Sequence, residues 1–559
     1  MLWLLDQTLN HYFPTLIHWT LIVLFSLTLP WMVIGFWNGI IGFLICLCIK
    51  KPLSIILPKN LQNCEDYSLN SSTALLFCIR NENSGRVIHN LEIMMDSLIQ
   101  AGHERYFHVY ILSDSTTESI KLSESRLFEK LNHEYGQQIN IVYRCRETNE
   151  GYKAGNIANF CQQYGKLHDF AITLDADSFM TAAAMARLVK MMQSDQQLGI
   201  LQGLVIGLPS SSAFTRLFQY GMRLGMRSYT MGSAWWQSDF GPYWGHNAII
   251  RLDPFMKYCQ LPEIKTITGY SKQILSHDLI EAVLMRRAGF QVRVYPCEDS
   301  SWEENPPTLT EYIRRDLRWC EGNLQYLKLI TLPRLKFISR IQLALAIFMF
   351  LGSPAWILMI VICTLSIATF PSVRETASGI YFYTFIWITL LMWYLPKIAG
   401  ALNVLLSTKE SQRFGGRWRF GISLVLETIF SLLMTPIAWL NHTIFMMSLP
   451  LGRQGGWASQ ARDSHTINLS YAVKQFWPHT VLGTALSLTL YFNHKDATLF
   501  GLLFFGGLLV SIPLAVITSQ KWLGNLMMKY KILSSPEEIA TPEELIPLHL
   551  NALHHHQTD

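Results

Sequence analysis

The sequence predicts an α/β domain with a parallel sheet, inserted among transmembrane α-helices. Of the 559 residues, 50% are hydrophobic and 15% are Asp, Glu, Lys or Arg, whereas an ordinary soluble protein carries about 25% charged residues. Several uncharged runs reach the roughly 20 residues that cross a bilayer. Between these runs, residues 51–340 form a charged block in which strand-like and helix-like stretches alternate, as in parallel α/β sheets. This composition excludes a disordered chain, a collagen and a simple cytosolic enzyme.

Residues 1–50 are predicted to be a transmembrane anchor. No Asp, Glu, Lys or Arg lies between Gln7 and Ile49, and Lys50 and Lys51 follow directly. Paired lysines at the end of an apolar run mark its cytoplasmic edge, so the N-terminus is expected outside. The segment before the run lacks the basic start of a signal peptide, which favours a retained anchor over a cleaved one. A tight hairpin is the alternative for the same run.

The charged block, residues 51–340, is expected to form a domain on the cytoplasmic side. Short apolar runs alternate in its first half with stretches of helical periodicity, and this alternation is typical of a parallel sheet. Ligands of such sheets bind beyond the carboxyl ends of the strands, so the polar residues after each strand are the candidate site. The predicted strands are Thr73–Ile79, Phe107–Leu112, Ile139–Arg144 and Phe170–Leu174, and the predicted helices are Val87–Gly102, Glu118–Tyr135 and Ala154–Tyr164.

Apolar runs return in residues 341–520, which are expected to hold the remaining spans and some interfacial segments. Basic residues around Arg413 and Arg453, and the tail 521–559, indicate cytoplasmic loops. Both ends of Gly421–Gly452 then lie on one side, so this run is expected to be a hairpin, a re-entrant pair or an interfacial helix. We expect about seven spans in all. The five runs are Ile341–Val373, Thr376–Pro396 continuing past Lys397, Gly421–Gly452, Gln475–His494 and Ala497–Gln520.

Three further features narrow the class of protein. The formal net charge of +5 is small for this length, which argues against a nucleic-acid partner. The ten cysteines form no CxxC pair, so we expect reduced thiols rather than a disulfide framework or a zinc site. Glu427 is the single acidic residue of its apolar run, which marks either a path for a polysaccharide or an ion pair with a nearby arginine.

Polar side chains follow four consecutive predicted strands and should face one crevice. Asp175 and Asp177 place two carboxylates in a turn after a buried strand, and such oxygen ligands suit Mg²⁺ or Mn²⁺ bridging a diphosphate. An isolated Asp-x-Asp is more often a solvated turn or a helix cap. Its place after the fourth strand, with a lysine available for a phosphate, favours the metal interpretation. The residues at the strand ends are Asn81, Glu82, Asp114, Lys153, Asp175 and Asp177.

Two later segments add candidates for chemistry. Asp278 precedes the helical stretch Leu279–Ala288, where it is either an N-terminal cap or a general base for an acceptor hydroxyl. Arg315 and Trp319 lie four residues apart on one predicted helix, with Arg318 beside Trp319. That helix is either an amphipathic segment at the membrane surface or a site in which arginine holds a phosphate and tryptophan stacks on a sugar.

These motifs, in this order and followed by several spans, resemble the processive family 2 glycosyltransferases, the relatives of cellulose synthase. Within that family the chain is most similar to the membrane glucosyltransferases of osmoregulated periplasmic glucan synthesis. The resemblance runs from about the first span to the last. It rests on Ile111–Ser115 (ILSDS), Tyr243–Arg251 (YWGHNAIIR), Ser276–Gly289 (SHDLIEAVLMRRAG) and Arg315–Asn323 (RDLRWCEGN).

The resemblance implies a GT-A type domain, a parallel-rich sheet with helices on both faces, and a role for each motif residue. Asp278 matches the catalytic base. Within a gating-like loop at residues 453–470, Gly455–Gln460 resembles a loop that gates the site, with an ordinary basic interfacial turn as the alternative. Arg315 replaces the glutamine of the family's Gln-x-x-Arg-Trp motif. The implied ligands of the uridine are Glu82 and Asp114, of the diphosphate Lys153, Asp175, Asp177, Arg315, Arg318 and Trp319, of the metal Asp175 and Asp177, and of the acceptor sugar Tyr243, Trp244, His246, Asn247 and Trp319.

The resemblance also implies the reaction and its setting. We expect an enzyme of the Gram-negative inner membrane that uses UDP-glucose and Mg²⁺ or Mn²⁺ to build a linear β-1,2-glucan and pass it to the periplasm. Implied partners are the bilayer, the growing glucan, an acyl carrier protein and a periplasmic glucan-processing protein. The N-terminal region is shorter than in the better-known members, which puts their regulatory contacts in doubt here. A transferase for another sugar or a lipid acceptor, and a catalytically dead UDP-binding scaffold, remain as alternatives.

Overall fold

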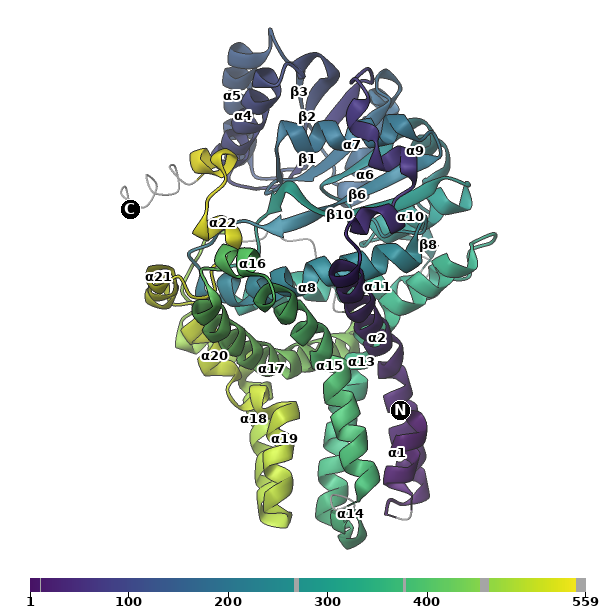
Figure 1. The fold of residues 1–559 in the computed structure, drawn as a ribbon, viewed down its shortest axis with the longest axis vertical. Helices are drawn as coiled ribbons and strands as arrows, with labels where there is room; N and C mark the ends of the chain where they lie inside the picture. The colour runs from purple at the N-terminus through teal and green to yellow at the C-terminus, as the bar shows by residue number, and fades with distance from the viewer. Residues whose placement is uncertain (11, 266–270, 376–378, 453–461, 549–559) are drawn as a thin grey trace.

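The computed structural model describes residues 1–10, 12–265, 271–375, 379–452 and 462–548. A sheet with its helices lies at one end of the molecule, and the long apolar helices extend away from it at the other end (Figure 1). Helix α8 (Ala213–Gln237) lies between the two parts. It contacts strands of the sheet on one side and the long helices on the other. The predicted arrangement of an α/β domain among apolar helices is therefore confirmed.

Within the described ranges, eight strands form one mixed sheet in the order β3-β2-β1-β4-β7-β6-β10-β5. The four strands that the sequence predicted are parallel neighbours. β7 runs antiparallel between β4 and β6, β10 is parallel to β6, and β5 pairs antiparallel with β10. The strands are β1 (Thr73–Ile79), β2 (Phe107–Ser113), β3 (Ile141–Cys145), β4 (Phe170–Asp175), β5 (Phe179–Met180), β6 (Leu198–Gly207), β7 (Ala248–Arg251) and β10 (Gln291–Glu303).

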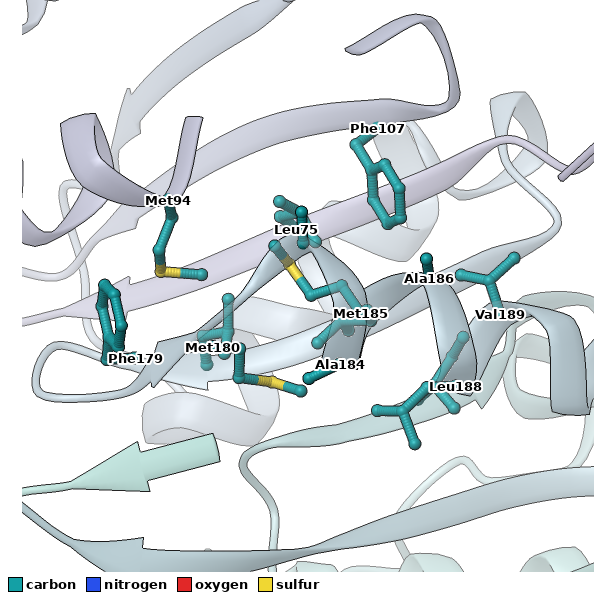
Figure 2. Close-up of a cluster of buried hydrophobic side chains, with 14 of the residues drawn as sticks. Leu75, Met94, Phe107, Phe179, Met180, Ala184, Met185, Ala186, Leu188 and Val189 are labelled. Carbon is teal, nitrogen blue, oxygen red and sulfur yellow. The ribbon is translucent and has the colours of Figure 1, made fainter. Parts of the chain in front are cut away.

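Helices cover both faces of the sheet, as the alternation of side chains along β1 requires. Leu75 and Phe77 face one layer and belong to the same buried cluster as Met94 and Met185. Figure 2 shows Leu75 among the side chains of this cluster. Ala74 and Leu76 face the opposite layer. The helices of the domain are α4 (Ser84–Gln100), α5 (Glu118–Tyr135), α6 (Tyr152–Gln163), α7 (Ala182–Ser194), α9 (Leu252–Tyr258), α10 (Asp278–Arg287) and α11 (Leu309–Leu324).

The apolar part differs from the prediction in the number of spans. Among the described residues, four helices are long and apolar enough to cross a membrane, or five if the pair α19–α20, bent by 54°, is one span. This is fewer than the expected seven, partly because α18 does not reach that hydropathy. The helices of this part are α1 (Leu2–Leu9), α2 (Thr15–Cys48), α13 (Phe337–Thr369), α15 (Ile380–Leu405), α16 (Thr408–Arg413), α17 (Arg417–Ser448), α18 (Leu469–Asn493), α19 (Lys495–Leu509), α20 (Ser511–Thr518) and α21 (Lys521–Tyr530).

Two expectations about single runs are corrected. The run Gly421–Gly452 is neither a hairpin nor a re-entrant pair, because α17 continues unbroken through it and contains Pro436. The anchor is likewise one continuous helix, α2, rather than a tight hairpin. Basic residues at both ends of an apolar run therefore do not require a turn within the run.

Glu427 forms an ion pair, with Lys397 of α15 rather than an arginine. The Lys397 Nζ lies 2.7 Å from Glu427 Oε2, and Ser431 donates a hydrogen bond of 2.7 Å to Oε1. The carboxylate lies directly over Gly221 of α8, since a Cβ built on that glycine would be 2.2 Å from Oε1. The ion pair thus joins α15 and α17 above α8, and a side chain at residue 221 would have to displace the Glu427 carboxylate.

A close crossing of α2 and α8 attaches the α/β domain to the first long helix. A Cβ on Gly42 would lie 1.7 Å from the backbone oxygen of Ser228, and one on Gly232 would lie 2.1 Å from that of Asn38. Because backbone atoms cannot move aside, Gly42→Ala is expected to lower the free energy of unfolding by about 1–3 kcal/mol. The thermal unfolding midpoint of the detergent-solubilised protein measures this.

Gly35 of the same helix provides the control for that substitution. No atom lies within 4 Å of a Cβ at this position. Gly35→Ala is expected to leave stability unchanged or raise it by up to about 1 kcal/mol, because alanine favours a helix more than glycine does. Equal unfolding midpoints for the two variants would contradict the close packing of α2 on α8.

Candidate active site

Gly245 is the point at which three predicted site residues meet. Lys153 of α6 forms an ion pair with Asp175 at the end of β4, and its Nζ donates a hydrogen bond of 2.8 Å to the Gly245 oxygen. A Cβ built on Gly245 would lie 3.5 Å from the Cβ of Asp278. Gly245 has a φ of +81°, which a side chain would strain. A lysine and two carboxylates from three elements are therefore brought together around one glycine.

The charges at this point stabilise one another. Burial raises the pKa of Asp175, but Lys153, His246 and Arg462 outweigh burial and lower it to about 2. For Lys153, burial lowers the pKa, but the nearby Asp175 carboxylate outweighs burial, so that the pKa of Lys153 is raised overall. Both groups are thus charged at neutral pH, as binding of a cation or a diphosphate requires.

Arg462 reaches two predicted site residues from a distant part of the chain. Its Nε lies 3.2 Å from Glu82 Oε2, and its Nη1 pairs with Asp177. Burial lowers the pKa of Arg462, but Asp177 and Glu82 outweigh burial and raise it above its ordinary value. From its sequence context, Arg462 was expected only to belong to the basic stretch that follows Arg453. Residues Gly455–Gln460 of the expected gating loop lie outside the described residues, so only the part of that loop from Arg462 onward is placed.

Asp114 lies at the end of β2 and is held by Arg146, a residue that the sequence reasoning did not select. Arg146 donates from Nε to Oδ1 and from Nη2 to Oδ2, both over 2.7 Å. Such a bidentate pair fixes the carboxylate in one orientation. Arg146 directly follows β3, so the rule that picked the other strand ends was sufficient to find it.

Asp278 begins α10, but it is not the residue that caps the helix. His277 is the N-cap residue, and its side chain makes no capping hydrogen bond. Asp278 is the first helical residue, where its Oδ1 accepts a hydrogen bond of 3.0 Å from the Leu279 N–H. A carboxylate here is stabilised by the positive end of the helix dipole. The capping interpretation of Asp278 is therefore wrong, and its side chain is only partly buried.

A buried pair behind Asp278 supports the start of α10. His277 Nδ1 lies 2.9 Å from Glu281 Oε2, and both side chains are buried. Burial lowers the pKa of His277, but Glu281 outweighs burial and raises it. Burial raises the pKa of Glu281 above its ordinary value. This pair fixes the turn that holds Asp278 against Gly245.

The four residues expected to contact the acceptor lie at different depths. Tyr243 is buried, and its hydroxyl lies 3.1 Å from that of Thr173. Asn247 is fully buried and accepts a hydrogen bond of 2.5 Å from Ser178. Trp244 and His246 are partly exposed. These two side chains are accessible to a ligand, whereas Tyr243 and Asn247 support the backbone around Gly245.

Arg315 and Trp319 lie on α11, with the Arg315 Cζ 4.9 Å from the centre of the Trp319 ring. Trp319 is 48% exposed, which leaves a face of its ring open for stacking. Burial lowers the pKa of Arg315 and lowers that of Arg318 to about 10. The Arg315 Nε is buried and has no hydrogen-bond partner among the described residues. One donor of this arginine is therefore available to a ligand.

The carboxylates of the site suit a metal that is held mainly by its substrate. In the described part of the chain, no group of three or more His, Cys, Asp or Glu residues could hold a metal ion by itself. Mg²⁺ is commonly bound by one or two carboxylates together with substrate phosphates. Asp175 and Asp177, each paired with a cationic side chain here, fit that arrangement.

Glu304, which follows β10, predicts a pH dependence of stability. Burial raises its pKa to about 7, and Arg86 and Arg462 only partly oppose this. The folded protein therefore holds this proton more tightly than the unfolded chain, so the free energy of unfolding falls as the pH rises from about 4.5 to about 7. Glu304→Gln is expected to remove this decline and to be more stable than the wild type by about 2 kcal/mol at pH 8.

The measurement is denaturant unfolding at several pH values, without nucleotide or divalent cation. At pH 4 the variant and the wild type should be equally stable, since the glutamate is then protonated in both states. Parallel pH profiles for the two proteins would show that Glu304 is not the group responsible.

Comparisons with known proteins place these observations in context. Residues 170–396 match the family described as glycosyl transferase family group 2. A protein of Vibrio cholerae serotype O1, named glucans biosynthesis glucosyltransferase H, is 33% identical over 545 residues, covering 94% of this chain and 74% of its own. The protein of that name from Shewanella oneidensis is 33% identical over 551 residues, covering 94% and 73%. A mannosyltransferase structure from Pyrobaculum calidifontis, PcManGT with GDP-Man and Mn²⁺, aligns with a TM-score of 0.45 and 13% identity over 70% of this chain and 99% of that one.

Proposed function

Since this chain belongs to the family of the glucans biosynthesis glucosyltransferases H, and is therefore a hexosyltransferase of family 2, we propose that it is a processive, inverting glucosyltransferase. It transfers glucose from UDP-glucose to a growing linear β-1,2-glucan. The donor sugar and the linkage follow from the family and from the motif strings that the chain shares with it. The α/β domain lies on the cytoplasmic side of the inner membrane in this proposal, and the long helices anchor it.

Lys153, Asp175 and Asp278 lie close together at Gly245, and this arrangement is the main support for the proposal. In an inverting transfer the acceptor oxygen attacks the anomeric carbon while the bond from that carbon to the UDP oxygen breaks. Asp278 takes the proton from the acceptor hydroxyl, and the bonding electrons leave with UDP. Lys153 stabilises the negative charge that develops on the diphosphate. A base and a cation that both lie next to one glycine serve both ends of this displacement.

The donor is proposed to bind along the ends of the parallel strands. Glu82 and Asp114 hold the uridine part, Arg315 and Arg318 approach the diphosphate, and Trp319 stacks on the acceptor sugar with Trp244 and His246 beside it. A divalent cation, Mg²⁺ or Mn²⁺, would be held by Asp175 and Asp177 and would supply positive charge to the diphosphate when bound. Arg462 pairs with Glu82 and Asp177 in this structure. In this proposal, the divalent cation that binds with the donor replaces the positive charge of Arg462 at Asp177.

Fusion of the transferase to apolar helices fits a product that must cross a membrane. A polar glucan cannot pass through hydrocarbon without a protein-lined path. Export to the periplasm is therefore part of the proposal, as are contacts with an acyl carrier protein and a periplasmic glucan-processing protein.

Release of UDP by the purified protein in lipid tests the donor. UDP-glucose with Mg²⁺ should give UDP, UDP-N-acetylglucosamine and UDP-galactose should give far less, and a chelator should stop the reaction. Equal release from the three donors would overturn the choice of glucose. Binding of UDP without any release would instead support the catalytically dead scaffold.

A further inference from the structure

Helix α11 presents two different faces to its surroundings. Arg315 and Trp319 lie on the side of the transfer site, where the charge of Arg315 interacts with Glu303 and Asp177. On the opposite side, the fully buried Cys320 packs with Phe350 of α13 and Phe445 of α17. The site face of α11 is thus oriented by what its back face contacts in the long helices.

One polar contact joins that back face to both long helices. His442 of α17 lies with its Nε2 2.7 Å from Asp316 Oδ2 and with its Nδ1 2.9 Å from the Ser353 hydroxyl of α13. The side chains of His442 and Asp316 are 9% and 13% exposed, and Ser353 is buried. Asp316 directly follows Arg315 in the chain, so this contact fixes the turn of α11 that carries Arg315.

The set of Ser353, His442 and Asp316 has the residue types of a nucleophilic triad, but its setting excludes that role. The three side chains lie between packed helices, and the Phe350 ring meets the His442 ring edge-on at 5.0 Å. A nucleophile must reach its substrate, whereas Ser353 is 3% exposed. Both ring nitrogens of His442 are already engaged. Such a buried and fully paired network holds its elements in one arrangement.

We propose that His442 is a positioning residue of the transfer reaction: by holding Asp316 against α13 and α17, it sets the position of Arg315 and Trp319 in the active site. The inference rests on the proposed glucosyltransferase activity and adds a residue from the long helices to it. It predicts that loss of His442 impairs the placement of reacting groups without loss of the proposed uridine contacts of Glu82 and Asp114, which lie in the segments after β1 and β2.

Steady-state kinetics of His442→Ala tests the positioning role. Misplacement of a reacting group by an ångström costs about 100-fold in rate, so we expect kcat for glucan synthesis to fall by about 10-fold to 100-fold. The dissociation constant of UDP should rise by a smaller factor than kcat falls, because Arg315 is only one of the groups proposed to hold the diphosphate and the uridine contacts remain. His442→Gln, whose amide can still donate and accept, should restore most of the rate. In the double variant with Asp316→Ala, the loss should not exceed that of the worse single variant, because both changes break one contact.

A neighbouring pair supplies a matched control. Asn441, also on α17, donates a hydrogen bond of 2.9 Å to His479 of α18, and both residues are buried. Among the described residues, the side chains of this pair make no hydrogen bond to α11. Asn441→Ala should therefore keep kcat close to that of the wild type, although it also removes a buried polar side chain.

Hydrogen exchange gives a readout that does not depend on activity. Backbone amides of residues 309–324 should exchange faster in His442→Ala than in the wild type or in Asn441→Ala. Equal exchange and equal kcat in the two alanine variants would overturn the positioning role, as would additive losses in the double variant. A wild type that makes no glucan would count against the proposed function instead, and the exchange experiment would still decide whether His442 holds α11.

Discussion

Asp278→Asn is expected to lower the rate of glucosyl transfer by about 10³-fold, within the range that a general base contributes. Asparagine keeps the size of the side chain and its acceptor for the Leu279 N–H, which Asp278 Oδ1 binds over 3.0 Å, but it cannot take a proton at neutral pH. The affinity for UDP should stay close to that of the wild type, because the uridine and the diphosphate are proposed to be held by other residues. Initial rates of glucose incorporation and a separate UDP titration measure the two quantities.

Asp253 offers a control of the same type and local setting. It lies in the first turn of α9, as Asp278 lies in the first turn of α10, and it is exposed. If Asp278 served only the helix terminus, Asp253→Asn and Asp278→Asn would have similar small effects on stability and none on the rate. A variant of Asp278 that retained more than a tenth of the wild-type rate would exclude it as the base.

Asp177→Asn is expected to lower activity by about 10²-fold or more, the order of loss seen when one preorganised group that stabilises a transition state is removed. Two carboxylates are the protein's share of the proposed cation site, so loss of one should raise the Mg²⁺ concentration needed for half-maximal rate. It also removes the partner of the Arg462 Nη1. A titration of initial rate against Mg²⁺ and Mn²⁺ checks the shift.

Asp299→Asn is the matched control for that substitution. Asp299 pairs with Arg187 over 3.2 Å and is 22% exposed, so it too is a carboxylate with an arginine partner, although it is less buried than Asp177. Its replacement should leave the metal dependence unchanged. A metal dependence of Asp177→Asn equal to that of the wild type would remove Asp177 from the cation site.

The α/β domain was largely predictable because its signals are local. β1 and α5 begin and end at the expected residues, since an apolar run in a buried strand and a 3.6-residue period in a helix are both readable from the chain. The strand-end rule led to Asp114, Lys153, Asp175 and Asp177, and the structure places these residues at the ends of parallel strands or on the helix that follows. What could not be read was pairing over long distances. β7 enters between β4 and β6 in the opposite direction, and no local pattern announces this.

The surroundings of several site residues could not be predicted for the same physical reason, because they depend on parts of the chain that are distant in sequence. Arg462 meets Glu82 from 380 positions further along the chain, and a basic residue in a loop gives no sign of such a partner. Asn247 and Tyr243 belong to a motif string, but motif membership does not show burial. Of the two interpretations of Asp278, the helix cap rested on the preference for aspartate at that position; in the structure His277 is the N-cap residue and the Asp278 carboxylate lies beside Gly245.

In the proposed reaction, glucose from UDP-glucose is added to a growing glucan beside Gly245, and Asp278 is the general base. The most direct test of this reaction is to incubate the purified protein in lipid with radiolabelled UDP-glucose and Mg²⁺, and to determine the size and linkage of the labelled product. A β-1,2-linked glucan, formed by the wild type and not by Asp278→Asn, is the predicted result. Absence of polymer while UDP still binds would contradict glucan synthesis. A polymer that Asp278→Asn makes equally well would contradict the role of Asp278 as the base.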